Sequence, residues 1–292
     1  MIIYIYPNLK KDNSALYTEK ACEILASRCV EITMDATYRA QFQHIAGLRF
    51  GAEETLAAQC DVILVVGGDG TILKCAKLAA RHQKPMLGLN CGRLGFMASL
   101  EHSELHLLEK FCTGEFTLNK RMMLDAHLRC ADGREEQFTA LNDVILTKTD
   151  GSRIVDFSVT KNGRVIYSVR ADGLIFSTPT GATAYALSAG GPLIEPDMQC
   201  IEFTPICPHS LFSRSMIFSP ETEVSVRYQP LDGHSTVVMS ADGGRGVAIS
   251  AQDTLFIKKS ADSISLVDIT GGSFFASVNR KLIKPLKDDT AP

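Results

Sequence analysis

The sequence predicts an α/β domain with an open, mostly parallel sheet, then an all-β, sandwich-like domain, with a C-terminal tail that returns to the first domain. Strand and helix patterns alternate over roughly the first hundred residues, and strand patterns follow one another closely after about residue 120. An Asn162-Gly163 pair between two alternating strands adds a hairpin signal. We therefore expect an α/β domain at 1–110, a β-rich domain at 111–270 and a tail at 271–292, with the seam near 100–120.

In the first half of the sequence, patterns of buried strands alternate with patterns of amphipathic helices. Val62–Val66 is a run of five aliphatic residues, which is typical of a strand buried on both faces of a parallel sheet. Ile72–His82 carries basic residues on one face and apolar residues on the other, which predicts an amphipathic helix. Right-handed crossovers would join these segments. The other predicted segments are strands at Met1–Tyr6, Val30–Met34 and Met86–Leu89, a helix from a capping Ser14 to about Arg28, and a helix at Glu53–Cys60.

In the second half, short alternating strands predict antiparallel pairing, as a sandwich or a layered sheet. Val155, Phe157 and Val159 alternate with polar neighbours, and the residues beyond the Asn162-Gly163 turn do the same. From Gly271 onward the pattern is helical. The predicted strands are Met122–Arg129, Phe138–Thr147, Ile154–Lys161, Arg164–Arg170, Leu174–Ser177, Glu223–Tyr228, Ser235–Ser240, Gly246–Ser250, Leu255–Lys258 and Ser263–Asp268.

The composition excludes several classes of protein. With 292 residues, 45% of them hydrophobic and 22% charged, the chain fits a globular protein with a sizeable core. A net charge of −3 and a pI near 6.2 argue against a dedicated binder of nucleic acid or of membrane surfaces. No apolar run approaches the ~20 residues of a membrane span. Nine cysteines without a C-x-x-C pair indicate reduced thiols and a cytoplasmic protein.

Glycines surround an aspartate directly after the most apolar strand, in "GGDGT". Where a parallel strand gives way to a helix, unpaired N–H groups and the positive helix end point toward one place, where phosphate binds well. Neither a P-loop nor a G-x-G-x-x-G fingerprint fits these residues. One interpretation is a tight turn in which Asp69 caps the helix. The other is a phosphate-binding loop formed by Gly67, Gly68, Gly70 and Thr71.

Any role for Asp69 in a phosphate-binding loop must account for its charge, because that charge repels a phosphate group. Its carboxylate can accept the proton of a hydroxyl group that attacks the phosphate, while glycine amides and Mg²⁺ hold the phosphoryl group. On the phosphate-binding interpretation, the segment carries out phosphoryl transfer to an alcohol, with Asp69 as the base.

A second cluster of polar residues follows the strand Leu174–Ser177, in "STPTGATAYALSAGGP". A short helix from about Ala182 to Gly190 would carry Thr183, Ala184, Tyr185 and Ser188 in one small region. This is either plain core packing or a wall with an aromatic face and hydroxyl groups that suits a flat heterocycle.

A polar pair, Asn142-Asp143, interrupts an apolar strand in "ALNDVILTK". Buried polar groups need partners. The pair therefore marks a bulge or an edge position, or else it reaches ribose hydroxyls or a base edge.

Together, "GGDGT", "CGRLGF", "LNDV" and "DGLIFSTPTGATAYALSAGGP" resemble the bacterial NAD kinase family, the ATP- or polyphosphate-dependent NAD kinases. The resemblance runs roughly from Val62 to Gly246, and "STPTGATAY" makes it specific. A lone GGDG would not, because diacylglycerol-type lipid kinases and phosphofructokinases also carry it. The resemblance implies transfer of a phosphoryl group from ATP or polyphosphate to the 2′-hydroxyl of the adenosine ribose of NAD, giving NADP.

The resemblance also implies roles for single residues. Asp69 would face the 2′-hydroxyl as base, with Gly70 beside the substrate, and Phe96 would pack against the adenine. Asn142 and Asp143 would hold the nucleoside. The adenine subsite would be lined by Thr183, Ala184, Tyr185 and Ser188.

Two further residues concern the assembly of the chain. Arg170 and Asp172 would reach the nicotinamide end of NAD in a neighbouring subunit's site, which implies a homodimer or a homotetramer. Asp143 departs from the family, which more often has glutamate there, so its contact with the ribose would be looser or bridged by water. Asp242 in "SADGG" is a weaker match to a DG pair near the family's site.

We expect Mg²⁺ or another divalent metal to act with ATP, and no metal site made by the protein alone. His102 and His106 in "HSELH" lack the H-E-x-x-H order, so a solvated helix face is the better interpretation. Two other functions share the scaffold: a diacylglycerol-type lipid kinase, and a non-catalytic NAD(P)-binding sensor. The first leaves the Tyr185 region unexplained, and the second has no use for the charge of Asp69.

Overall fold

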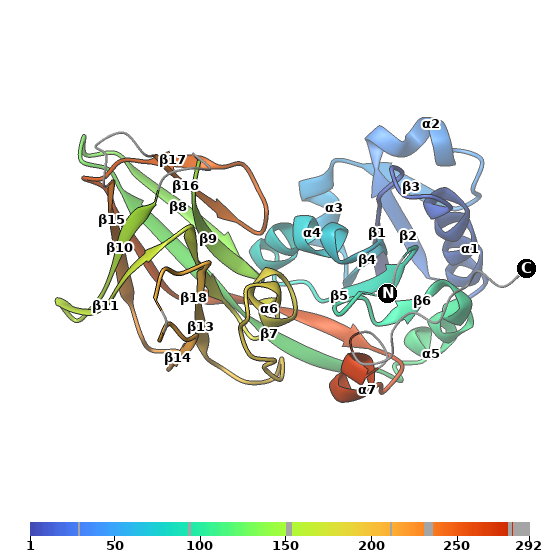
Figure 1. Ribbon diagram of the computed structural model, residues 1–292. Helices are drawn as coiled ribbons and strands as arrows, with labels where there is room; N and C mark the ends of the chain where they lie inside the picture. Colours follow the sequence, from blue (N-terminus) through green and yellow to red (C-terminus); the bar gives the residue numbers. More distant parts are fainter. Residues whose placement is uncertain are drawn as a thin grey trace, which may run out of the picture. The chain divides into compact units, whose positions relative to one another are not determined.

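The computed structural model describes residues 1–28, 30–92, 95–149, 154–210, 212–230, 236–279 and 282. It divides into two compact units (Figure 1). The first comprises Met1–Lys120 and the described residues from Ile264 onward, and the second is Arg121–Ser263. Arg93 and Leu94 of the "CGRLGF" motif, and most of the predicted tail at 271–292, lie outside the described residues.

The first unit is built on a parallel sheet, as the alternation of patterns predicts. Its strands are β1 (Ile2–Pro7), β2 (Glu31–Asp35), β3 (Leu48–Gly51), β4 (Val62–Gly67), β5 (Met86–Asn90), β6 (Leu100–Glu101) and the last part of β18 (Thr254–Asp268). The order is β18-β5-β4-β1-β2-β3, β6 also pairs with β5, and these pairings are parallel. All six residues of β4 are buried, which confirms that this strand is covered on both faces.

Helices cover both faces of this sheet (Figure 1). The helices of this unit are α1 (Ser14–Ser27), α2 (Arg39–Phe42), α3 (Glu53–Gln59), α4 (Asp69–Arg81), α5 (Leu108–Cys112) and α7 (Phe274–Val278), with 3-10 turns η1 (Ala36–Tyr38) and η2 (His102–Leu107). One core cluster joins α1 and α5 to β1, β2, β4 and β5. The prediction that Ser14 caps α1 is wrong, because Ser14 is the first helical residue and Asn13 occupies the cap with φ 58° and no side-chain bond.

The second unit contains two antiparallel sheets. The first has the order β11-β10-β15-β18, with β7 paired to β18 and to β8, and the other has the order β14-β13-β12-β9-β16-β17. Their strands are β7 (Thr117–Arg129), β8 (Glu135–Ala140), β9 (Asp143–Lys148), β10 (Val155–Lys161), β11 (Arg164–Ala171), β12 (Gly173–Ser177), β13 (Ile201–Ile206), β14 (Met216–Phe218), β15 (Val224–Pro230), β16 (Val237–Ala241) and β17 (Val247–Ile249).

The core of the second unit lies between these two sheets. One cluster of buried side chains draws on strands of both, for example Phe157 of β10 and Phe176 of β12. The alternation along β10 predicted this, since Val155, Phe157 and Val159 are all buried. The predicted hairpin is also confirmed: β10 pairs with β11, and Asn162 and Gly163 have φ values of 52° and 73°. The predicted fold class, α/β followed by an all-β sandwich, is thus correct.

Several element boundaries differ from the prediction. The expected strand Phe138–Thr147 is two strands, because the chain turns at Leu141-Asn142 between β8 and β9. The expected strands Leu255–Lys258 and Ser263–Asp268 are one continuous strand, β18. β13 and β14 were missed, because "IEFTPI" mixes polar and apolar residues on two faces that are both buried. No described helix is long and apolar enough to cross a membrane.

Candidate active site

The GGDGT segment of the first unit joins the end of β4 to the start of α4. β4 ends at Gly67, Gly68 is the extended N-cap residue, and α4 begins at Asp69, three residues earlier than the predicted Ile72. A side chain at Gly67 would not fit, because an ideal Cβ would lie 2.4 Å from the Thr71 hydroxyl oxygen. Gly70 is exposed. The N–H of Thr71 donates to the Gly68 carbonyl at 2.7 Å, and Asp69 and Gly70 stand at the helix N-terminus, a position that suits phosphate.

Thr71 faces inward and braces this turn. Its side chain is buried, and its hydroxyl oxygen accepts a hydrogen bond from the Asn8 amide at 2.9 Å. Asn8 follows β1, the strand next to β4. Because Asn8 donates to it, the Thr71 hydroxyl keeps its own hydrogen for another acceptor. Sequence reasoning missed Asn8, which lies 63 residues from Thr71 in the chain.

The carboxylate of Asp69 is held by the backbone of the segment 95–98. One oxygen accepts the N–H of Phe96 at 2.6 Å, and the other accepts those of Met97 and Ala98 at 3.2 and 3.3 Å. An ideal Cβ on Gly95 would lie 2.0 Å from the carboxylate, so only glycine fits there. The two predicted motifs "GGDGT" and "GF" are therefore brought together, with Asp69 fixing the backbone that carries the half-buried Phe96.

Asn90 organises the neighbouring strand end and was also missed. It is fully buried at the end of β5, opposite Gly67 of β4. Its amide donates to the Gly92 carbonyl at 3.2 Å and to the Glu101 carboxylate at 3.0 Å, and its oxygen accepts the Gly92 N–H at 3.1 Å. The sequence did offer one signal for Asn90, because a polar residue there ends an apolar strand.

In the second unit, the Asn142-Asp143 pair lies at the turn between β8 and β9 and is braced by Asp242. The Asp242 carboxylate accepts the N–H groups of Leu141, Asn142 and Asp143 at 2.8, 2.7 and 3.2 Å. Asp242 in turn donates its own N–H to the Asp143 carbonyl at 3.0 Å. The weaker motif "SADGG" therefore supports the "LND" turn, and its aspartate holds backbone in place.

Both side chains of the pair are buried in a setting that favours ligand binding. Asn142 and Asp143 are 8% and 4% exposed. Among the described residues, the side-chain oxygen of Asn142 has no hydrogen-bond partner. Burial, and then the negative charge of Asp242, raise the pKa of Asp143 to about 7. A buried acceptor without a donor, beside a carboxyl group of raised pKa, is a strong mark of a functional site.

The "STPTG" segment packs directly on this turn. The N–H of Thr178 donates to the Asn142 carbonyl at 2.8 Å, and the Thr178 hydroxyl donates to the Leu141 carbonyl at 2.6 Å. An ideal Cβ on Gly181 would lie 2.2 Å from the same Asn142 carbonyl oxygen. The structure thus brings "LND", "STPTG" and "ADG" together in one place.

The predicted helix from Ala182 to Gly190 is broken into two pieces. A 3-10 turn, η3 (Gly181–Thr183), is followed by a single helical turn, α6 (Tyr185–Ser188), because Ala184 has a non-helical backbone. Tyr185 and Ser188 are exposed and remain one turn apart on α6. Thr183 is half-buried and donates its hydroxyl to the Thr180 carbonyl at 3.1 Å. None of the four predicted residues is fully buried: Tyr185 and Ser188 are exposed, and Thr183 and Ala184 are half-buried.

Arg170 and Asp172 lie apart from this cluster. They stand before β12, whereas Thr178 follows it, so a five-residue strand, roughly 17 Å long, separates them. Arg170 forms a two-pronged ion pair with Asp156, at 2.9 and 3.3 Å, and Asp172 pairs with Lys148 at 2.7 Å.

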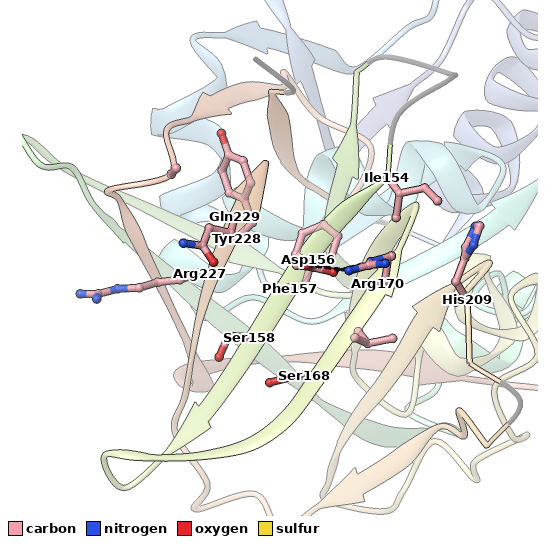
Figure 2. Close-up of a pocket in the computed structure, with 12 residues that line it drawn as sticks. Ile154, Asp156, Phe157, Ser158, Ser168, Arg170, His209, Arg227, Tyr228 and Gln229 are labelled. Carbon is pink, nitrogen blue, oxygen red and sulfur yellow. Dashed lines mark hydrogen bonds and ion pairs between the residues drawn. The ribbon is translucent and has the colours of Figure 1, made fainter. Parts of the chain in front are cut away.

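The Arg170–Asp156 pair lies in an open surface hollow that strands β10, β11 and β15 form with the His209 region. Figure 2 shows the ion pair at the centre of this hollow, with His209 to one side of it. Polar residues from the outer faces of the three strands line it, among them Ser158, Ser168, Arg227 and Gln229. The hollow contains none of the other predicted site residues.

Comparison with known proteins decides the family. Residues 3–116 match the model of the ATP-NAD kinase N-terminal domain, and residues 141–269 match that of the ATP-NAD kinase C-terminal domain. The chain belongs to the ATP-NAD kinase family. It is therefore an enzyme of the kinase class, and the predicted family is confirmed.

Relatives in this family align over nearly the whole chain. The NAD kinase of Caldanaerobacter subterraneus subsp. tengcongensis is 35% identical over 285 residues, which are 95% of this chain and 97% of the relative. That of Natranaerobius thermophilus is 34% identical, over 95% and 96% of the two chains.

Two solved structures share the fold. Yeast NADH kinase complexed with NADH has a TM-score of 0.87 at 22% identity, covering 100% of this chain and 90% of that chain. An NAD kinase from Archaeoglobus fulgidus in complex with ATP has a TM-score of 0.70 at 24% identity, covering 95% and 98%.

Proposed function

We propose that this ATP-NAD kinase family member transfers a phosphoryl group from ATP to the 2′-hydroxyl of the adenosine ribose of NAD, making NADP. The observation that carries the proposal is the setting of Asp69. Its carboxylate stands at the first residue of α4, among glycine amides that suit phosphate, and three peptide N–H groups fix its position. An alcohol presented there would meet an acceptor for its proton beside an anchored phosphoryl group.

The second unit supplies the recognition of the nucleoside in this proposal. The side-chain oxygen of Asn142 is buried and has no donor among the described residues, so a ligand N–H or O–H would satisfy it. Asp143 beside it accepts hydroxyl hydrogens of the ribose when ionised. Tyr185 and Ser188 on α6 offer an exposed aromatic face and a hydroxyl for the adenine.

In this proposal a divalent cation acts together with the phosphates of the donor. No group of three or more His, Cys, Asp or Glu side chains able to hold a metal occurs within the described part of the chain. Mg²⁺ commonly binds through one or two carboxylates plus substrate phosphates, which this arrangement allows. When bound, it would neutralise charge on the phosphoryl group. The protein's own part is to orient the hydroxyl and accept its proton at Asp69.

The names of the relatives support the proposed substrates. The related yeast structure holds NADH and the archaeal one holds ATP. ATP is therefore the proposed donor, with polyphosphate as a second donor to be tested, and NAD is the proposed acceptor, with NADH beside it. Lipid kinase activity, the alternative on the same scaffold, has no support from these relatives.

The proposal includes an oligomer in which Arg170 and Asp172 act in a neighbouring subunit's site. The position of both residues beyond the far end of β12 supports this, because their own chain's "LND" and "STPTG" segments lie at the other end of that strand. Mixing an inactive D69N chain with an inactive D172A chain would test it. Activity recovered on mixing, from an oligomer seen by sizing, is expected. No recovery from mixed oligomers would exclude a shared site.

The activity itself is tested by incubating the purified chain with NAD, ATP and Mg²⁺ and detecting NADP with an NADP-specific dehydrogenase. Parallel reactions replace ATP by polyphosphate and NAD by NADH. NADP formation that needs both substrates is expected. Absence of NADP and NADPH with every donor, from protein that unfolds cooperatively, would overturn the proposed function.

A further inference from the structure

A buried carboxyl group, Glu202, has no role in the chemistry described so far. It is the second residue of β13 and is paired with Ser177 of β12, which is itself paired with Asp143 of β9. Residues paired across neighbouring strands point to the same face of a sheet. Glu202 therefore shares the face of the nucleoside-binding residues, opposite the face that carries the buried Phe203 and Phe176 of the core.

The side chain of Glu202 is held on one side only. It is 0% exposed, and one carboxyl oxygen accepts the Thr204 hydroxyl at 2.9 Å. The Thr204 hydroxyl is also 2.8 Å from that of Ser215, which extends the polar group. Among the described residues, the second carboxyl oxygen has no hydrogen-bond partner. Burial raises the pKa of Glu202 to about 7, although the bond from Thr204 opposes this shift. Such a group is costly to bury, which calls for a reason.

The bonded oxygen of Glu202 touches the chain just beyond α6. An ideal Cβ on Gly191 would lie 2.0 Å from this oxygen and 3.0 Å from the Thr204 hydroxyl oxygen. The N–H of Gly191 donates to the carbonyl of Ala186, within α6, at 2.9 Å. The carboxyl group and Thr204 therefore form a floor on which the end of α6 rests. α6 is the single turn that carries Tyr185 and Ser188.

A single helical turn has little stability of its own, since isolated short helices are marginal in water. Its position must come from what it packs against. Apolar contacts between Ala186 and Ile175 hold one side of α6, and the Glu202–Thr204 floor holds the chain at its exit. The exposed faces of Tyr185 and Ser188 keep their direction only while this support is in place.

We infer that Glu202 is a positioning residue for the nucleoside-binding segment 178–191: its carboxyl group, with Thr204, fixes α6 through Gly191 and so orients Tyr185 and Ser188 toward NAD. The inference rests on the proposed function for its substrate. It makes Glu202 act through α6, without a contact to NAD.

The test compares E202Q and E202A with a matched control, D253N. Gln keeps the shape and the acceptor for Thr204, whereas Ala removes the floor. Asp253 is also a buried carboxylate of the same unit, at 6% exposure, but it bonds Ala131 and Ser250 far along the chain from 178–191. We expect E202A to raise the KM for NAD about tenfold, less than the ~100-fold that misplacement by about 1 Å can cause. Its kcat and its KM for ATP should change less than about twofold, and E202Q and D253N should resemble the wild type.

A second pair of variants approaches the contact from the other side. In G191A the new methyl group presses on the carboxyl oxygen, so the KM for NAD should rise here too. The double variant E202A/G191A should be less impaired than the sum of the single changes, because the clash is gone. These variants also serve if E202A alone does not fold. Unchanged KM in E202A and in G191A, or an equal rise in D253N, would overturn the inference.

Hydrogen exchange separates this inference from the proposed function. In the free protein, E202A should speed exchange of the amides of residues 185–191 more than that of the rest of the second unit, and D253N should not. This readout needs no substrate. If the wild type made no NADP while E202A loosened only residues 185–191, the proposed function would fail and the positioning role would stand. If E202A changed the exchange rates equally across the whole second unit, the positioning role would be rejected.

Discussion

The raised pKa of Asp143 predicts how NAD binding depends on pH. Burial and the charge of Asp242 raise this pKa from 3.8 to about 7. In the proposed complex the ionised carboxylate accepts hydroxyl hydrogens of the ribose, so only the ionised fraction of the enzyme binds NAD well. A carboxyl group loses its proton as pH rises, so the competent fraction grows through pH 7. The KM for NAD should therefore fall as pH rises, and the D143N variant should lose this dependence.

The size of the effect follows from the printed pKa. With a pKa of about 7, roughly one molecule in eleven is ionised at about pH 6 and ten in eleven at about pH 8. The apparent dissociation constant is the intrinsic one divided by the competent fraction. The KM for NAD should thus be about tenfold higher at pH 6 than at pH 8. Binding of NAD should in turn lower the pKa of Asp143 and release a proton.

The assay is steady-state kinetics with NAD varied at saturating ATP, at half-unit steps from pH 6 to pH 8. E202Q is the internal control, because Glu202 has a similar pKa of about 7 but makes no proposed contact with NAD. E202Q should keep the tenfold change, and D143N should give a flat profile. A wild-type KM that is constant between pH 6 and pH 8, or a D143N profile as steep as the wild type, would refute the role given to the Asp143 carboxylate.

Three further outcomes are expected. D69N should lower kcat by at least about 100-fold, because it removes the base. It should also speed hydrogen exchange at Phe96–Ala98, because an amide group replaces one of the accepting oxygens. Wild-type turnover in D69N would contradict the base assignment. For stability, a carboxyl pKa raised from 4.5 to about 7 favours folding below about pH 4.5 and loses this contribution as pH rises to 7. Urea titrations at about pH 4.5 and 8 should therefore show E202Q gaining about 3 kcal/mol on the wild type across that range, and an equal pH dependence of the two proteins would contradict this. Chelation by EDTA should stop turnover but leave the thermal midpoint of the free protein unchanged, since the described residues hold no metal cluster; activity that survives EDTA would contradict the need for a divalent cation.

The elements that the sequence predicted well are those whose pattern is local. The aliphatic run of β4 and the alternation along β10 follow directly from the burial that each strand has in the sheet. The Asn162-Gly163 turn needs only its own two residues to adopt positive φ. "GGDGT" was placed correctly between strand and helix for the same reason, although α4 starts at Asp69 and not at the predicted Ile72.

The features that the sequence could not supply depend on contacts between distant segments. Asp242 bonds the "LND" turn from about a hundred residues away, and Asp69 bonds the segment 95–98 from 27 to 29 residues away. No periodicity encodes such contacts. The break at Ala184 was missed because the residues around it are ordinary helix formers, and contacts with distant segments, among them the close approach of Gly181 and Gly191 to neighbouring oxygens, set the course of the chain there. Glu202 could not be recognised, since a single carboxylate in a strand is usually exposed.

The glycines of the motifs share one physical purpose. At Gly95, Gly181 and Gly191 an ideal Cβ would lie 2.0, 2.2 and 2.0 Å from an oxygen of Asp69, Asn142 and Glu202 respectively. None of the three has a positive φ, so their backbone geometry is open to any residue. Gly163 is the opposite case, with φ 73° and open space around it.

Each of these three glycines thus lets the chain approach an oxygen that matters to the site more closely than a side chain would allow. Asp69 is the proposed base, Asn142 belongs to the proposed nucleoside site, and Glu202 supports α6. A glycine required by a positive φ depends on the backbone of its own turn. A glycine required by close approach depends on one partner atom elsewhere in the chain. The "GF", "STPTG" and "AGG" glycines therefore mark the partner oxygens of the site as directly as its polar residues do.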